Sequence, residues 1–260
     1  MTGWPLALKT SRILVTNDDG IYAPGLQVLI ETAMGLSDDV WVVAPETEQT
    51  GAGHSLTLRR PLRVREADDR RFAVDGTPTD CVMMAINRIM EEHRPDLVLS
   101  GVNRGSNLGE DVTYSGTVSA AMEATILGVP AIAMSQDFSD NEAVPWGTSR
   151  RHAPDLIERL CRQGWPQDTL VNVNFPAVQP GDVRGVTVAS QGRRKTGDNI
   201  VEAHDPRGQP YYWIGGVRKE EDWSDGTDLA AVAAGRIAVT PISIDFTDYR
   251  ALHELEQVFV

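Results

Sequence analysis

The chain has 260 residues, of which 41% are hydrophobic and 23% charged, and this balance is typical of a folded globular protein rather than a disordered one. Its 24 basic and 37 acidic residues give a formal net charge of −13, which argues against duplex nucleic acid as a partner, because that polyanion is bound mainly by basic surfaces. A small phosphorylated substrate is compatible with this charge, since one bound cation reverses the local field.

The cysteines and the N-terminal segment indicate a cytoplasmic protein. Cys81 and Cys161 are the two cysteines, and their spacing predicts neither a disulfide framework nor a zinc site. We interpret residues 1–11 as a short extension rather than a signal peptide, because a basic start followed by an apolar stretch and a cleavage site is lacking. No stretch approaches the roughly 20 apolar residues of a membrane span, so we expect no membrane partner.

Short apolar strands alternate with helical segments through the first half of the chain. A β-branched strand over 12–17, a helix opening at Pro24 and a strand over 40–44 form the first unit. Further elements are expected at 55–58, 62–64 and 72–74 (short extended runs), 80–93 (helix, with Thr79 as N-cap), 96–100 (strand), 117–127 (helix) and 131–134 (strand). The alternation predicts an α/β fold with a mostly parallel sheet and helices on both faces.

The composition changes after about residue 180, where Gly, Asp and Arg become frequent. The elements expected there are an aromatic strand at 211–214, a short helix at 227–235, a strand at 236–244 interrupted by Pro241, and a terminal helix near 248–258. Proline within a strand indicates an edge or a bulge. We therefore predict a smaller, β-rich C-terminal part.

Two adjacent carboxylates, Asp18 and Asp19, follow the first strand directly. The carboxyl end of a parallel strand is where α/β proteins build binding sites. Neighbouring carboxylates repel one another unless a cation lies between them, and hard divalent cations bind such oxygen ligands. A solvated Asp-Gly turn is the alternative, but the helix that follows at once favours the metal site.

Asn103 and Asn107 occupy the corresponding place after the strand at 96–100. Asn103 offers a neutral oxygen ligand, and Asn107 offers a second amide within a glycine-rich loop. A long loop capped by asparagines is the alternative interpretation.

The segment Ser115-Gly116-Thr117 begins a predicted helix. Free N–H groups and the helix dipole make such a position an anion site, and glycine permits a close backbone approach to phosphate. An ordinary Ser or Thr N-cap is the commoner use of these residues and stays open as the alternative.

The loop over 49–55 carries Thr50 and His54 on either side of two glycines. Thr50 supplies a hydroxyl, and His54 is either a proton donor to a leaving group or a loop histidine bound to backbone. A flexible hairpin tip is the alternative for the whole stretch.

Taken in chain order, these motifs resemble the SurE family, the stationary-phase survival proteins that act as nucleotidases. The matching strings are RILVTNDDG (12–20), APG (23–25), VVAPETEQTGAGHSLTL (42–58), VDGTPTDCV (74–82), PDLVLSGVNRGSNLGEDVTYSGTVSAAMEA (95–124), NVNFP (172–176), DPRG (205–208), YYWIG (211–215), GTD (226–228) and VTPI (239–242). The resemblance implies a Rossmann-like catalytic α/β region over 12–180 and a β-hairpin region used in oligomerisation over 181–260, together one SurE-like domain. It also implies metal-dependent removal of phosphate from nucleoside monophosphates, with 3′-nucleotidase and short-polyphosphate activities left open.

The resemblance also assigns site residues by position. It implies one divalent metal ion, Mg²⁺ or Mn²⁺, on ligands matching Asp18, Asp19, Thr50 and Asn103. The family usually has serine at the position of Thr50, and a threonine hydroxyl can also coordinate a metal. Asp18 or Asp19 would act on the attacking water, and the phosphate would contact Asn107, Ser115, Gly116 and Thr117.

Two other functions remain open at this point. An aspartyl-phosphate phosphatase would use Asp18 or Asp19 as a nucleophile, but such enzymes usually have a DxD spacing and a lysine near the phosphate, and no lysine lies between Lys9 and Lys195. A noncatalytic nucleotide sensor would use the same residues without turnover.

The aromatic segment over 190–225 indicates assembly. Tyr211, Tyr212, Trp213 and Trp223 lie there among glycines and charged residues, and an isolated hairpin is marginally stable in water. Covering these side chains against a second subunit is the simpler solution, and packing onto the chain's own sheet is the alternative. We expect a homodimer or homotetramer.

Overall fold

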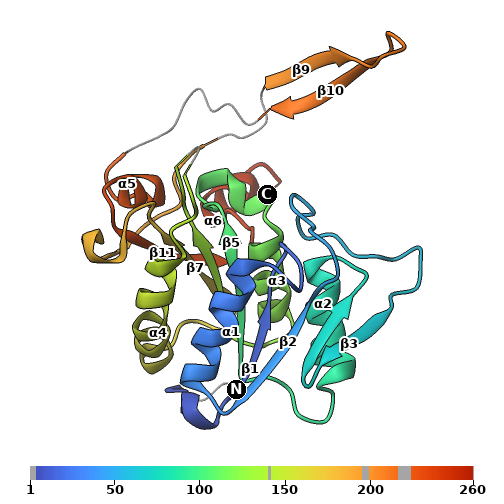
Figure 1. The fold of residues 1–260 in the computed structure, drawn as a ribbon. Helices are drawn as coiled ribbons and strands as arrows, with labels where there is room; N and C mark the ends of the chain where they lie inside the picture. Colours follow the sequence, from blue (N-terminus) through green and yellow to red (C-terminus); the bar gives the residue numbers. More distant parts are fainter. Residues whose placement is uncertain (1–3, 140–141, 195–198, 216–223, 260) are drawn as a thin grey trace.

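A nine-stranded, mostly parallel sheet forms the centre of the protein in the computed structural model, which describes residues 4–139, 142–194, 199–215 and 224–259 (Figure 1). In spatial order the strands are β3 (Val64–Asp68), β4 (Arg71–Val74), β2 (Asp39–Pro45), β1 (Arg12–Thr16), β5 (Leu97–Arg104), β6 (Ala131–Gln136), β7 (Thr169–Phe175), β11 (Ile237–Ser243) and β8 (Val186–Val188). The pairs β3–β4 and β7–β11 are antiparallel and the other neighbours are parallel. A separate antiparallel hairpin joins β9 (Asn199–His204) to β10 (Pro210–Gly215).

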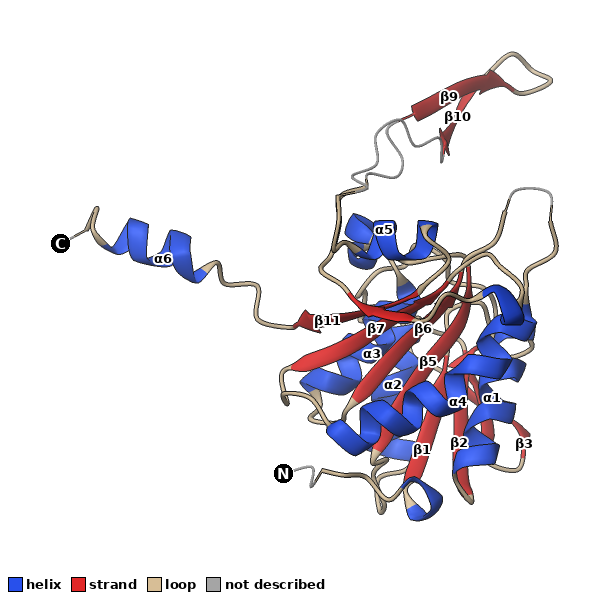
Figure 2. Ribbon diagram, turned by 90° about the vertical axis from the view of Figure 1, so that its left-hand side faces the viewer, coloured by secondary structure: helices blue, strands red, loops and turns tan. Residues whose placement is uncertain are grey.

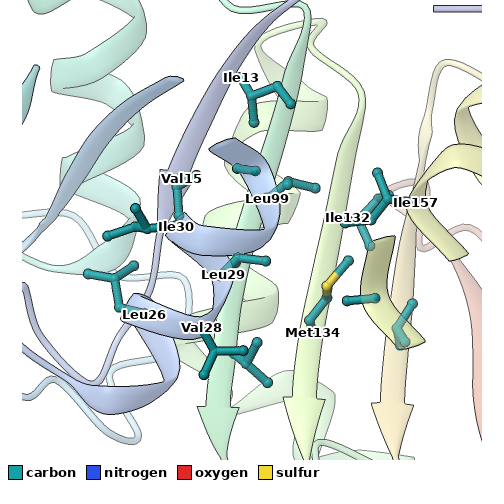
Figure 3. Close-up of a cluster of buried hydrophobic side chains, with 14 of the residues drawn as sticks. Ile13, Val15, Leu26, Val28, Leu29, Ile30, Leu99, Ile132, Met134 and Ile157 are labelled. Carbon is teal, nitrogen blue, oxygen red and sulfur yellow. The ribbon is translucent and has the colours of Figure 1, made fainter. Parts of the chain in front are cut away.

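Helices cover both faces of the large sheet (Figure 2). Helices α1 (Pro24–Leu36) and α4 (Trp146–Gln163) bury apolar side chains on one face, and α2 (Pro78–Met84) and α3 (Gly116–Ile126) do so on the other. Figure 3 shows α1 placing Leu26 and Leu29 near Val15 and Leu99 of the sheet. The predicted α/β fold class is confirmed. The remaining elements are the helices α5 (Asp228–Ala233) and α6 (Tyr249–Glu256), the 3₁₀ turns η1 (Leu8–Thr10), η3 (Gly109–Thr113) and η4 (Pro180–Asp182), and the π-helical turn η2 (Ala85–Ile89).

The strand order sets the place of a binding site. From β1 the chain moves to β2 on one side, and it later returns to β5 on the other side of β1. In open α/β sheets, ligands bind outside the carboxyl ends of the strands at such a reversal. Asp18 and Asn103 follow β1 or end β5, so the topology brings both to that crevice.

The helix predicted over 80–93 begins earlier and ends earlier than expected. It starts at Pro78, and Thr77 rather than Thr79 is its N-cap. The Thr77 hydroxyl accepts from the Asp80 N–H at 3.1 Å while the Asp80 carboxylate accepts from the Thr77 N–H at 2.9 Å, which is a capping box. Thr79 is fully buried inside the first turn, and its hydroxyl is without a partner among the described residues.

One expected strand does not form, one helix and one strand were not expected, and the edge position predicted for Pro241 is confirmed. No strand forms over 55–58, the run expected at 62–64 meets β3 only at Val64, and the run at 72–74 lies in β4, which pairs with β3 as a hairpin. Helix α4 and strand β7 were not predicted from the residues at all. Pro241 does lie on an edge, because β8 pairs with β11 only over Ile237–Val239, so the outer side of β11 is unpaired at the proline.

The C-terminal part contributes to the main sheet as well as to separate elements. Strands β8 and β11 extend the large sheet beyond β7, whereas the β9–β10 hairpin and α6 project from the body (Figure 2). Helix α6 buries none of its residues. The division of the chain at residue 180 stays a prediction. No helix in the part of the chain that the structure describes is long and apolar enough to cross a membrane.

The corrected cap gives a matched pair of substitutions. Thr77→Ala removes the capping hydroxyl and should lower the free energy of unfolding by about 1 kcal/mol. Thr79→Val keeps the buried volume and removes an unpaired hydroxyl, so it should leave stability unchanged or raise it. Urea unfolding of both variants measures the difference, and a larger loss for Thr79→Val would contradict this assignment of the cap.

Candidate active site

Asp18 is a buried acid that lies just beyond the carboxyl end of β1. It is 3% exposed and accepts a hydrogen bond from the Thr117 hydroxyl at the start of α3. Burial raises the pKa of Asp18 to about 6; the neighbouring Asp19 adds to this rise and the hydrogen bond from Thr117 opposes it. Because burial makes the ionised form of this carboxylate unfavourable, a positive charge bound beside it would stabilise that form.

Gly116 permits the close contact between α3 and this acid. A Cβ atom at position 116 would lie 2.7 Å from Asp18 Cβ and 2.9 Å from Asp18 Oδ2. Any side chain there would therefore push the carboxylate away from the helix. Ser115 is the N-cap, and its Oγ accepts from the Val118 N–H at 3.1 Å. The first turn of α3 thus presents its N-terminal end beside Asp18, as an anion site requires.

Asp19 lies near two charged residues, Glu48 and Arg104, and local sequence patterns do not connect either of them with it. Its Oδ2 accepts from the Arg104 backbone N–H at 3.1 Å. Its pKa is raised by burial and by the charge of Glu48, and the N–H and guanidinium of Arg104 act in the opposite direction. The positive charge near Asp19 is therefore that of Arg104, the residue directly after Asn103.

The loop that carries Thr50 packs against Asp18 through its backbone. The Gln49 N–H donates to the Asp18 carbonyl at 2.8 Å. Thr50 itself is exposed, and its hydroxyl donates to Glu48 Oε1 at 2.7 Å. The neighbouring Gln49 therefore brings Thr50 close to Asp18, while the Thr50 hydroxyl itself is bonded to Glu48.

Asn103 and Asn107 have different surroundings. Asn103, at the end of β5, donates from Nδ2 to the Gly105 carbonyl at 2.9 Å, which leaves its amide oxygen available as a ligand. Asn107 is buried, and its Nδ2 donates to Ser135 Oγ at 2.8 Å. Its N–H donates to Asn174 Oδ1 at 2.8 Å, so a polar cluster fixes its position.

Strand β7 supplies two site-supporting residues that the sequence interpretation missed. Asn172 and Asn174 both donate from Nδ2 to the Asn107 carbonyl, at 2.9 and 3.1 Å. They alternate with valine in a buried strand, so both point to the same side of the sheet. Two asparagines at a spacing of two in an otherwise apolar strand were the available signal.

His54 meets a partner away from the two acids. Its Nε2 lies 2.8 Å from Glu123 Oε2, and Glu123 is a buried residue of α3. The next residue toward the N-terminus, Gly53, donates its N–H to the Tyr114 carbonyl at 3.1 Å. These contacts attach the loop over 49–55 to α3.

The residues fit an oxygen-ligated cation with few charged ligands. No group of three or more His, Cys, Asp and Glu side chains suited to a metal exists among the described residues. Asp18 and Asp19 both have raised pKa values, and the residue after Asn103 donates its N–H to Asp19. The buried Asn17 Oδ1 is without a hydrogen-bond partner in the same described set. This donor set matches hard cations that keep several waters.

The chain was compared with known proteins. A family model described as Survival protein SurE matches residues 13–198. The 5′-nucleotidase SurE of Paramagnetospirillum magneticum is 57% identical over 260 residues, which is 100% of each chain. The 5′-nucleotidase SurE of Rhodospirillum rubrum is 53% identical over 255 residues, which is 97% of each chain. The crystal structure of the SurE protein from Aquifex aeolicus is 40% identical, with a TM-score of 0.83, and covers 96% of this chain and 100% of that one.

The raised pKa of Asp18 predicts how stability depends on pH without divalent cations. The folded state holds this proton more tightly than the unfolded chain, so the stability that the protonated acid contributes is lost as pH rises from about 4 through about 6. Asp18→Asn does not titrate and should become more stable than the wild type by about 3 kcal/mol at neutral pH. Urea unfolding in chelator at several pH values measures the gap. A gap that is constant with pH would contradict the assigned burial effect.

Proposed function

The chain belongs to the SurE family, and we propose that it is a 5′-nucleotidase, which removes phosphate from nucleoside monophosphates. The observation that carries the proposal is the contact of Asp18 with the first turn of α3, because it joins an acid to an anion-binding helix end. Neither group would serve a phosphate ester alone. The expected substrate is a small nucleotide, and the two buried, free cysteines support a cytoplasmic location.

We include one divalent cation, Mg²⁺ or Mn²⁺, in this proposal. The residues that would hold it are Asp18, Asp19, Thr50 and Asn103. Their oxygen donors are the kind that both ions prefer, and two carboxylates with two neutral groups leave positions for water. When bound, the cation supplies polarisation of a phosphoryl oxygen and a water of lowered pKa.

The protein's own residues would position the reacting groups. Thr117 holds Asp18 in place through its hydroxyl, and the Arg104 N–H holds Asp19. The N–H groups at the start of α3, with Ser115 and Gly116, would bind phosphate oxygens, while Asn107 would contribute from its loop. Asp18 or Asp19 would orient the attacking water and accept its proton.

A phosphate-release screen tests the proposed function. Nucleoside 5′- and 3′-monophosphates and short polyphosphate are incubated with the protein in EDTA, and then with Mg²⁺, Mn²⁺ or Ca²⁺ restored. We expect release from 5′-monophosphates that requires a restored cation. Binding of nucleotide with no release under any cation would overturn the proposal in favour of a nucleotide sensor.

Asp19→Asn should retain the fold and lose most turnover. The amide keeps the shape of the side chain and removes one of two charges, so we expect a loss of about 10²-fold or more if the electrostatic contribution dominates. Phosphate release and far-UV circular dichroism measure the two properties. Full activity of this variant after exhaustive chelation would contradict a metal-dependent site.

Thr50→Ser and Thr50→Val separate coordination from packing. Serine keeps the oxygen and relaxes the stiff rotamer, so metal affinity should change little. Valine keeps the shape and loses the oxygen, so affinity should fall, since its hydroxyl is otherwise engaged only by Glu48 in the described structure. Metal titration of the three proteins measures this, and equal affinity for threonine and valine would show that Thr50 is not a ligand.

We also propose that the chain assembles into a homodimer or homotetramer through its C-terminal part. Tyr212 and Trp213 of β10 are 59% and 65% exposed, and Ile200 on the facing strand is 65% exposed. These side chains do not pack onto the chain's own sheet, whereas Trp223 lies outside the described residues. Exposed aromatic and aliphatic side chains on both faces of a hairpin are typical of a segment that is covered by a partner.

Sedimentation at micromolar concentration should give at least twice the mass of one chain. Replacing Trp213 and Ile214 by serine removes apolar surface from the hairpin and should shift the protein toward monomer. The matched control is a double serine substitution of Met34 on α1 and Ile126 on α3, which are 60% and 52% exposed and lie outside the C-terminal part. A wild-type monomer with full activity would defeat the proposal.

A further inference from the structure

The loop between Ser106 and Asp111 is held in place by residues that are distant in the sequence. This loop contains Asn107, and it leads through η3 to the Ser115–Thr117 segment. Its contacts come from residues 191–194 and from Asp228, which lie on either side of the β9–β10 hairpin. The proposed nucleotidase function assigns no role to residues 191–194 or to Asp228.

Arg194 makes the most extensive of these contacts. Its side chain is 4% exposed, and its Nε and Nη2 donate to Asp111 Oδ2 at 2.9 and 2.5 Å. Nη2 also donates to Ser106 Oγ at 3.1 Å, and the Arg194 backbone N–H donates to the Glu110 carboxylate. One planar guanidinium therefore joins both ends of the loop.

Asp228 holds the middle of the same loop. It is fully buried, and its Oδ2 accepts from the Gly109 N–H at 3.0 Å. Its Oδ1 accepts from the N–H groups of Gly192 and Leu229, both at 2.8 Å. The carboxylate thus joins the loop to the segment that carries Arg194. In all three hydrogen bonds its oxygens are the acceptors and a backbone N–H is the donor.

The contacts pass directly to the helix end that faces Asp18. The Asp111 carbonyl accepts from the N–H groups of Tyr114 and Ser115, both at 3.0 Å. Ser115 is the N-cap of α3. A shift of Asp111 would therefore move the cap together with Asn107, and small displacements of binding groups have large effects on catalysis.

We infer that Arg194 and Asp228 are positioning residues for phosphate binding: they hold the 106–117 segment in the geometry that the phosphate requires. The inference rests on the proposed function for its ligand. Arg194 acts through Asp111 and Asp228 acts through Gly109, so neither needs to touch the substrate.

The test compares Arg194→Gln, Arg194→Lys and Asp228→Asn with a matched arginine elsewhere. Arg236 is partly buried and also makes three side-chain bonds, to Thr187 Oγ1 and to the carbonyls of Arg184 and Val186, but none to the 106–117 segment. Arg236→Gln is therefore the control for lost stability. Four properties are measured: KM and kcat for a nucleoside 5′-monophosphate, the inhibition constant of inorganic phosphate, amide hydrogen exchange over 106–117, and Tm.

We expect Arg194→Gln and Asp228→Asn to raise KM and the phosphate inhibition constant together by about 10-fold, and to speed amide exchange over 106–117. Arg194→Lys should fall between wild type and Arg194→Gln, because an ammonium cannot reproduce the planar fork. Arg236→Gln should lower Tm and leave the other properties unchanged. When Arg194→Gln is combined with Asp111→Asn, the rise in KM should equal the larger of the two single rises, because the two side chains act as one unit.

Unchanged KM, inhibition constant and exchange in Arg194→Lys, Arg194→Gln and Asp228→Asn would overturn the inference. Equal changes in Arg236→Gln would overturn it too, because general destabilisation would then explain them. If the wild type released no phosphate from nucleotides, the proposed function would fail, and the exchange measurement would still show whether these residues hold the loop.

Discussion

The structure depends on a carboxylate that is buried against the end of a helix. Asp18 lies between the carboxyl end of β1 and the first turn of α3, where Thr117 donates to it and Gly116 makes room for it. Burial alone makes the ionised form costly, and the helix end and the hydroxyl only partly offset this cost. Asp18 therefore favours a positive charge beside it, while the N-terminal end of α3 favours an anion, and the proposed binding of cation and phosphate would satisfy both.

Much of this arrangement could be predicted because it depends on local sequence. Asp18 and Asn103 follow or end apolar strands, and parallel strands bring their carboxyl ends to one edge, so the two residues were expected to meet. Ser115 was recognisable as the beginning of a helix from its place before a helical segment. The mostly parallel sheet was also predicted, from the alternation of strands and helices.

The contacts that hold the site in place depend on pairing distant in the sequence, and local patterns do not reveal them. Nothing in the local sequence connects Arg104 with Asp19, yet the Arg104 N–H is bonded to that carboxylate. Asp228 falls at the start of the helix expected over 227–235, yet its carboxylate is a buried acceptor for the distant Gly109 N–H. The cap of α2 was misplaced by two residues, since Thr77 and Thr79 are equally good caps in sequence and only the reciprocal bond with Asp80 separates them.

The root of the β9–β10 hairpin is closed by a short bridge. Ser190 pairs with Thr227, and the Asp228 N–H donates to the Ser190 carbonyl at 2.9 Å. Strands β8 and β11 on either side of this bridge are fixed by their pairing within the sheet. Because the closure entropy of a loop grows only slowly with its length, the segment beyond Arg194 can lengthen, shorten or change sequence at small cost to the sheet. The β9–β10 hairpin can therefore change in length or sequence without disturbing the sheet, whereas a change at its root would alter the bond between Asp228 and the Gly109 N–H.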